Sequence, residues 1–222
     1  MAEELVFASY QAYRAVPEKV ASLDRDVAAK EIRQVLDDND EVETRGIYST
    51  AGFRADTDLL FWFVGSSIDR IQDLVVALGH TQLGRALERT HSFVGLVRPA
   101  EFAPDHRPAF VQGKPPRRYA CVYPFVRTPE WYLLDSQERG KHLSSHGALG
   151  REYPDVDPNT TSAFGMNDYE WILAFEADSL DRLVDLIRHL RANESRLYVK
   201  EEIPFITGIR KELDDILQDL PF

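Results

Sequence analysis

The stretch DLLFWFVGSSIDRIQDLVVALG, residues 58–79, is followed by a similar stretch, EWILAFEADSLDRLVDLIRHLR, residues 170–191. Both contain the pattern S-[IL]-D-R-[IL]-x-D-L. Each begins with an apolar run around a tryptophan, which is typical of a buried strand, and continues with apolar residues at helical spacing. Ser67 and Ser179 stand at the junctions, where serine favours a helix N-cap. The sequence therefore predicts a duplicated strand–helix unit.

The flanking segments of the two copies also match in kind. In the first half we expect strands at 6–16, 42–52 and 89–98 and a helix at 24–38. In the second half we expect strands at 117–127, 160–166 and 198–210 and a helix at 136–153. Each half then has the order β-α-β-β-α-β, which is ferredoxin-like.

A four-stranded sheet with helices on one face needs cover on the other face. Two such halves in one chain can supply that cover to each other. We therefore predict an α+β protein whose ferredoxin-like halves, residues 1–112 and 117–222, form a dimeric-type α/β barrel as one structural domain. The linker is expected at about 113–116, within the sequence QGKPP.

The composition narrows the class of protein. The 222 residues carry a net charge of −11. This charge argues against a nucleic-acid-binding protein, because contacts with phosphates need clustered Lys and Arg. No run approaches the roughly 20 apolar residues of a membrane-spanning helix, and the first residues do not resemble a signal peptide. Cys121 is the only cysteine, so no internal disulfide can form. We expect no nucleic-acid partner, no membrane span and a cytoplasmic location.

Two histidines, His142 and His146, lie one turn apart on the helix expected at 136–153. This spacing can place two imidazoles on one metal ion, although no third ligand is evident. Alternatively, His142 packs or faces solvent. His146 precedes Gly147, where a planar group can approach, and a single neutral imidazole is how a haem iron takes its proximal ligand. The residues alone leave these possibilities open.

The strand before that helix places Tyr123, Phe125 and Arg127 on one face, because they alternate. Phe125 offers apolar contact, Arg127 offers a fork for a carboxylate, and Tyr123 offers a phenol that can donate a hydrogen bond or be oxidised. The alternative is an aromatic core strand with a charged end.

Three segments of the second half carry a resemblance to a known family. They are VYPFVRTPEWYLLDSQERGKHLSSHG (122–147), YPDVDPNTTSAFGMNDYEWILAFEA (153–177) and RLYVKEEIPFITGIR (196–210). In the first half, VETRGIYSTAGFRADTDLLFW (42–62) and RPAEFAPDHRPAF (98–110) extend it. Together they resemble the actinobacterial coproheme decarboxylases, which belong to the chlorite dismutase-like superfamily of haem proteins.

The resemblance implies roles for particular residues. Tyr123 carries the catalytic radical, His146 is the proximal iron ligand, and His106 is the distal histidine of an E-F-x-x-x-H-x-P segment. The positions around the porphyrin and its propionates are Arg127, Trp131 and Arg196, and Phe125 is a further candidate because it offers apolar contact to the macrocycle. Glu201 or Glu202 is a candidate to orient the proximal imidazole.

The implied reaction belongs to haem biosynthesis. It is the hydrogen peroxide-dependent oxidative decarboxylation of two propionates of Fe-coproporphyrin III (coproheme), giving haem b through a three-propionate intermediate. The iron of the substrate is the redox centre. The resemblance also implies a homopentamer and possible transient contact with a coproporphyrin ferrochelatase.

Other functions remain as alternatives. A chlorite dismutase shares the proximal histidine but uses a distal arginine, and residues 159–165, NTTSAFG, contain none. A haem-dependent peroxidase is a further enzymatic alternative. A non-catalytic haem carrier or sensor is the alternative of another class, and the arginines and Tyr123 count against it.

Overall fold

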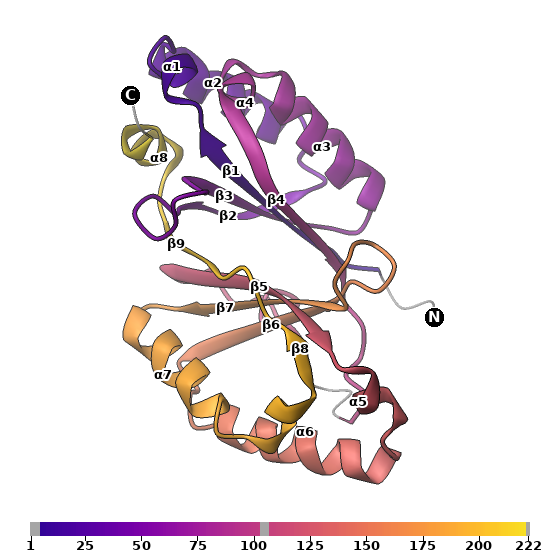
Figure 1. The fold of residues 1–222 in the computed structure, drawn as a ribbon. Coiled ribbons are helices and arrows are strands. Elements are labelled where there is room, and N and C mark those ends of the chain that lie inside the picture. Colours follow the sequence, from indigo (N-terminus) through magenta and orange to yellow (C-terminus); the bar gives the residue numbers. More distant parts are fainter. Residues whose placement is uncertain (1–4, 103–106, 221–222) are drawn as a thin grey trace. The chain divides into compact units, whose positions relative to one another are not determined.

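The computed structural model describes residues 5–102 and 107–220. Its contacts divide the chain into two compact units (Figure 1). The first unit comprises Met1–Leu96 and Ile206–Phe222, and the second comprises Val97–Phe205. Among the described residues, every helix is too short or too polar to cross a lipid bilayer.

The first unit is a five-stranded antiparallel sheet with the strand order β4-β1-β3-β2-β9. Its elements are β1 (Phe7–Ala15), α1 (Pro17–Val20), α2 (Arg25–Asp37), β2 (Glu43–Ser49), β3 (Leu59–Gly65), α3 (Ile68–His80), α4 (Gln82–Ala86), β4 (Leu87–Leu96), β9 (Ile206–Arg210) and α8 (Leu213–Asp219). The order of β1 to β4 is the ferredoxin-like order, and β9 extends it beside β2.

The second unit repeats this arrangement, with the strand order β6-β7-β5-β8. Its elements are β5 (Tyr119–Arg127), α5 (Pro129–Leu133), α6 (Ser136–Gly150), β6 (Val156–Ser162), β7 (Trp171–Ala177), α7 (Leu180–Leu190), the 3₁₀ helix η1 (Glu194–Tyr198) and β8 (Val199–Glu201). Both units therefore have the predicted β-α-β-β-α-β order.

The duplicated motif forms the predicted strand and helix in each unit. On α3, Ile71, Leu74 and Leu78 are buried, and the Ser67 hydroxyl accepts a hydrogen bond from the Arg70 N–H at 3.4 Å. The core residues of α7 occupy the same positions. Ser179 stands at the N-cap as predicted but makes no cap, because its hydroxyl donates to the Asp181 side chain instead.

The strand predicted at 160–166 begins earlier in the structure, since β6 spans Val156–Ser162. Its polar residues Asp157, Asn159 and Thr161 are all buried. Hydrophobic periodicity does not detect such a strand, because hydrogen bonds and ion pairs rather than apolar contacts stabilise its buried side chains.

The single strand predicted at 198–210 is two strands, β8 and β9. Pro204 lies between them and has no N–H to donate to a sheet. After this break the chain joins the first sheet, where Ile209 pairs with Ser49. Residues 206–222 therefore group with the first unit, although the sequence placed them with the second half.

The change from the first to the second unit also falls earlier than the expected linker at 113–116. It lies between Leu96 and Val97. The segment before the linker is docked on β6, because the Phe110 N–H donates to Asn159 Oδ1 at 3.0 Å and the Ala109 N–H donates to a β6 carbonyl at 3.2 Å.

A buried carboxylate joins the segment after the linker to β6. The Asp157 side chain is 2% exposed, and it pairs with Lys114 at 2.7 Å and with Arg117. Burial raises the pKa of Asp157, but hydrogen bonds and charges of both cations outweigh burial and lower it overall. The resulting stability is present above the ordinary aspartate pKa and is lost as the pH falls through the lowered value.

We expect Asp157→Asn to reduce the free energy of unfolding at neutral pH by roughly 2–4 kcal/mol, because it removes the buried carboxylate that Lys114 and Arg117 share and leaves Arg117 only the exposed Asp178. The measurement is urea unfolding over a series of pH values. The free energy of unfolding of the variant should also fall less steeply as the pH is lowered. Asp178→Asn is the control, since Asp178 binds the same Arg117 but is 67% exposed. Equal stability of the Asp157 variant and the wild type at neutral pH would contradict this expectation.

Candidate functional site

Helix α6 differs from its counterpart in the first unit. Helix α2 buries Ala28, Ala29 and Ile32 in the core, whereas no residue of α6 is buried. The core cluster of the second unit draws on α7 and on the strands, but on no residue of α6. The main contacts of α6 are with α7 and η1. Because no residue of α6 is buried within the protein, a bound ligand can supply apolar contacts to this helix.

The N-terminus of α6 is fixed locally. The Asp135 carboxylate accepts a hydrogen bond from the Glu138 N–H at 2.9 Å, as the capping pattern predicts. Near its other end, Asn193 donates from its side chain to the Ser145 hydroxyl at 2.8 Å, beside His146. These contacts position the helix without burying it.

His146 lies on α6, and its Nδ1 atom is buried and has no hydrogen-bond partner among the described residues. Burial lowers the pKa of His146, and the charge of Arg127 lowers it further, while Glu202 acts in the opposite direction. The imidazole is therefore neutral at neutral pH. A neutral imidazole is the form that binds a metal, so the residue fits a role as an iron ligand.

His142 packs instead of pairing with His146. Its ring lies 5.3 Å from the Tyr198 ring and 6.2 Å from the buried Trp131 ring, measured between centroids. Within residues 5–102 and 107–220, no three His, Cys, Asp or Glu side chains are grouped so as to hold a metal ion.

Arg127, at the end of β5, is held between aromatic rings. Its guanidinium carbon lies 4.1 Å from the Trp131 ring centre and 4.7 Å from that of Phe125, and Nη1 donates to the Ser195 carbonyl at 3.0 Å. Burial lowers the pKa of Arg127 to about 10, so it keeps its charge at neutral pH. Its guanidinium pairs with no carboxylate in the described part of the chain. The Glu170 carboxylate accepts a hydrogen bond from the Arg127 backbone N–H at 2.7 Å, and the charges of Glu202 and Glu170 raise the pKa of Arg127, but neither carboxylate pairs with the guanidinium. A largely buried guanidinium with no directly paired carboxylate indicates a site for an anionic ligand group.

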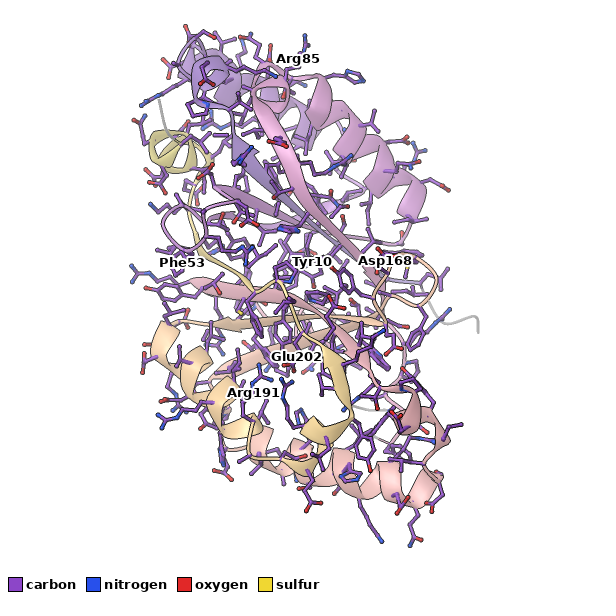
Figure 2. All side chains as sticks on the ribbon, viewed as in Figure 1. Tyr10, Phe53, Arg85, Asp168, Arg191 and Glu202 are labelled. Atoms are coloured by element: carbon purple, nitrogen blue, oxygen red, sulfur yellow. The ribbon has the colours of Figure 1, made fainter. Side chains whose placement is uncertain are left out.

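Glu202, just after β8, pairs with two arginines. Its side chain is 10% exposed and accepts hydrogen bonds from Arg191 and Arg196, whose side chains are 38% and 42% exposed. Figure 2 shows Arg191, at the end of α7, beside Glu202. Arg196 is thus already engaged by a carboxylate of the protein.

Tyr123 lies on β5 and is 5% exposed. Its ring stacks on Phe205 with a centroid distance of 4.4 Å. Burial raises the pKa of Tyr123, Cys121 and Glu202 raise it further, and Arg191 and Arg196 act in the opposite direction. The phenol is therefore protonated at neutral pH, and its oxidation requires the loss of a proton as well as an electron.

The charge of Glu202 influences the pKa of Tyr123, of Arg127 and of His146. The Glu202 carboxylate thus acts electrostatically on all three candidate residues. Its ion pair with Arg191 was not predicted, since no local sequence pattern links the two. Neither Glu201 nor Glu202 accepts a hydrogen bond from His146 Nδ1 in the structure.

His106 lies outside the described residues. The other candidates are all described: Tyr123, Phe125, Arg127, Trp131, His146 and Arg196 belong to the second unit. Arg127, Phe125 and Trp131 make direct ring contacts, whereas Arg196 is bound to Glu202.

Comparison with known proteins identifies relatives over most of the chain. The family model described as chlorite dismutase matches residues 25–211. A coproheme decarboxylase from Mycolicibacterium smegmatis is 46% identical over 197 residues, which cover 88% of this chain and 84% of the relative. A coproheme decarboxylase from Oceanobacillus iheyensis is 24% identical, covering 90% of this chain and 88% of that protein.

The fold is also found among solved structures. Chlorite dismutase from Candidatus Nitrospira defluvii in complex with imidazole matches with a TM-score of 0.87 at 20% identity, covering 98% of this chain and 95% of that one. This likeness confirms the predicted fold class. The family model and the relative that is 46% identical carry the assignment further: this chain belongs to the chlorite dismutase family.

Proposed function

We propose that this protein is a coproheme decarboxylase. It removes carboxyl groups from two propionates of coproheme, with hydrogen peroxide as oxidant, and releases haem b after a three-propionate intermediate. The observation that carries the proposal is the largely buried guanidinium of Arg127, which pairs with no carboxylate of the described residues and shares a strand with Tyr123. A propionate of the four-propionate porphyrin would pair with this guanidinium.

The residues of the second unit fit this substrate. The neutral His146, whose ring makes no hydrogen bond to any described residue, would hold the iron. Arg127 would bind a propionate, and Phe125 and Trp131 would contact the apolar macrocycle. When bound, coproheme supplies the iron that reacts with peroxide.

Each decarboxylation is a two-electron oxidation. The side chain CH₂CH₂COO⁻ becomes CH=CH₂ and releases CO₂, one proton and two electrons, and one peroxide takes up two electrons and two protons to give two waters. Tyr123 would lose an electron and its phenolic proton, and would then take a hydrogen atom from the propionate chain. His106 is proposed as the base that accepts a proton from peroxide.

Arg127→Met tests the anion site with two opposite expected effects. Because the variant removes a largely buried charge that no described carboxylate pairs with directly, ligand-free protein should gain about 1 kcal/mol, or roughly 2–4 °C in Tm. Coproheme binding should weaken roughly tenfold through loss of a charge-assisted hydrogen bond. Calorimetry and absorbance titration measure the two effects.

The control for this variant is Arg118→Met. Arg118 also lies over an aromatic ring, that of Tyr119 at 5.3 Å, but it is exposed. It should change neither quantity appreciably. A lower Tm of the ligand-free Arg127 variant together with unchanged binding would show that Arg127 serves only the packing of the unit.

The assembly and the location are part of the proposal. We propose a homopentamer, a transient contact with a coproporphyrin ferrochelatase that supplies the substrate, and a cytoplasmic location. The lone Cys121 supports the location, because a chain with one cysteine does not depend on an oxidising compartment for an internal disulfide.

The function is tested by loading the protein with ferric coproheme and supplying peroxide or chlorite in parallel. Conversion of the porphyrin with peroxide, and no dioxygen from chlorite, is the expected result. Rapid dioxygen release from chlorite would establish the chlorite dismutase alternative. Stable binding of coproheme with no reaction under either condition would establish a carrier.

A further inference from the structure

The Glu202 carboxylate is shared between Arg191 and Arg196. Two guanidinium groups and one carboxylate leave a net positive charge at this cluster. Glu202 itself is nearly buried, while each arginine keeps over a third of its side-chain surface exposed. The arginines therefore remain accessible to a further anion.

This cluster belongs to the site already described. Glu202 follows Glu201, which pairs with Val126 of β5, and Arg196 follows Ser195, whose carbonyl accepts the hydrogen bond from Arg127 at 3.0 Å. The charges of the cluster also act on Tyr123, the residue proposed to react with the propionate. Arg127 differs from these arginines, because its guanidinium is stacked between rings and pairs with no carboxylate in residues 5–102 and 107–220. The site thus contains one arginine whose guanidinium pairs with no described carboxylate, and two arginines that share the carboxylate of Glu202.

A carboxylate of the protein and a propionate carboxylate are chemically equivalent partners for arginine, since both accept the same forked hydrogen bonds. We propose that Glu202 binds Arg191 and Arg196 only until coproheme binds, and that a propionate of coproheme then replaces the Glu202 carboxylate as the partner of both arginines. Glu202 is then a specificity-determining residue, and this inference rests on the proposed function.

This exchange of the Glu202 carboxylate for a propionate at Arg191 and Arg196 would let the protein discriminate between substrate and product. A propionate competes with Glu202 for the arginines, whereas a vinyl group has no charge and accepts no such hydrogen bond. After the carboxyl group leaves as CO₂, Glu202 recovers both arginines. The exchange favours retention of a porphyrin that still has a carboxyl group to lose, and release of one that has none.

Metal-free porphyrins test the exchange without iron ligation or turnover. The probes are coproporphyrin III, with four propionates, and protoporphyrin IX, with two propionates and two vinyl groups, and binding is followed by fluorescence titration. In Glu202→Gln the arginines have no competing carboxylate. Coproporphyrin should bind roughly three- to tenfold more tightly, and the affinity for protoporphyrin should change less than about twofold.

Glu201→Gln is the matched control, because Glu201 is the adjacent carboxylate and lies on β8. It should leave the ratio of the two affinities unchanged. If Glu202→Gln does not fold, Arg191→Gln serves instead, and it should weaken coproporphyrin binding by a similar factor while sparing protoporphyrin.

Equal shifts for both porphyrins in Glu202→Gln, or weaker binding of coproporphyrin, would overturn the exchange while leaving the proposed function in place. Failure of the wild-type protein to bind coproporphyrin would instead overturn the proposed function and this inference with it.

Discussion

Replacement of Tyr123 by phenylalanine is expected to abolish decarboxylation and to leave coproheme binding intact. The variant keeps the ring that stacks on Phe205 at 4.4 Å and removes only the hydroxyl. No described residue hydrogen-bonds to that hydroxyl, so the protein should lose little stability. Without a phenol, the residue cannot give up a proton with its electron, and the rate should fall by at least about a thousandfold.

Two measurements separate chemistry from binding in this variant. Mass spectrometry of the extracted porphyrin follows carboxyl loss, and absorbance titration gives the Kd, which should stay within about twofold of wild type. Tyr119→Phe is the control, since Tyr119 lies on the same face of β5 four residues earlier. Near-normal turnover in Tyr123→Phe would exclude Tyr123 as the oxidised residue.

His146→Ala is expected to remove the iron ligand and to weaken coproheme binding about a hundredfold. The absorption and electron paramagnetic resonance spectra of ferric coproheme should change, and added imidazole should partly restore them. The ligand-free protein should not be destabilised, because the buried Nδ1 of His146 has no hydrogen-bond partner to lose.

His142→Ala provides the contrast on the same helix. It should leave the spectrum unchanged but reduce the free energy of unfolding by roughly 1 kcal/mol, because the His142 ring packs against Trp131 and Tyr198. An unchanged spectrum in His146→Ala together with an altered one in His142→Ala would reverse the two assignments.

The elements that the sequence predicted well are those with a local signal. The α3 and α7 helices follow apolar residues at helical spacing, and Ser67 caps α3 as a serine at that position should. The start of β6 was predicted too late in the sequence, because Asp157 and Asn159 are buried polar residues and produce no hydrophobic pattern. Pro204 marks the β8–β9 break in the sequence, but the sheet that the chain joins after it depends on the pairing of Ile209 with Ser49, a tertiary interaction.

The candidate site also has a part that a local sequence pattern predicts and a part that it does not. Alternation along β5 was sufficient to place Phe125 and Arg127 on one face, and the structure joins them through a cation–π contact. The ion pair of Glu202 with Arg191 joins a residue just after β8 to one at the end of α7, and no periodicity connects these segments. Burial of the Arg127 guanidinium between aromatic rings is likewise a property of the folded unit.

The central claim is that this protein decarboxylates coproheme, and titration of the coproheme-loaded protein with hydrogen peroxide under mass spectrometry tests it most directly. Each of two steps should remove CO₂ and two hydrogen atoms from the porphyrin and consume one peroxide. The three-propionate species should rise and then fall as haem b forms. A porphyrin that keeps all four propionates, or that is degraded without a three-propionate species, would contradict the claim.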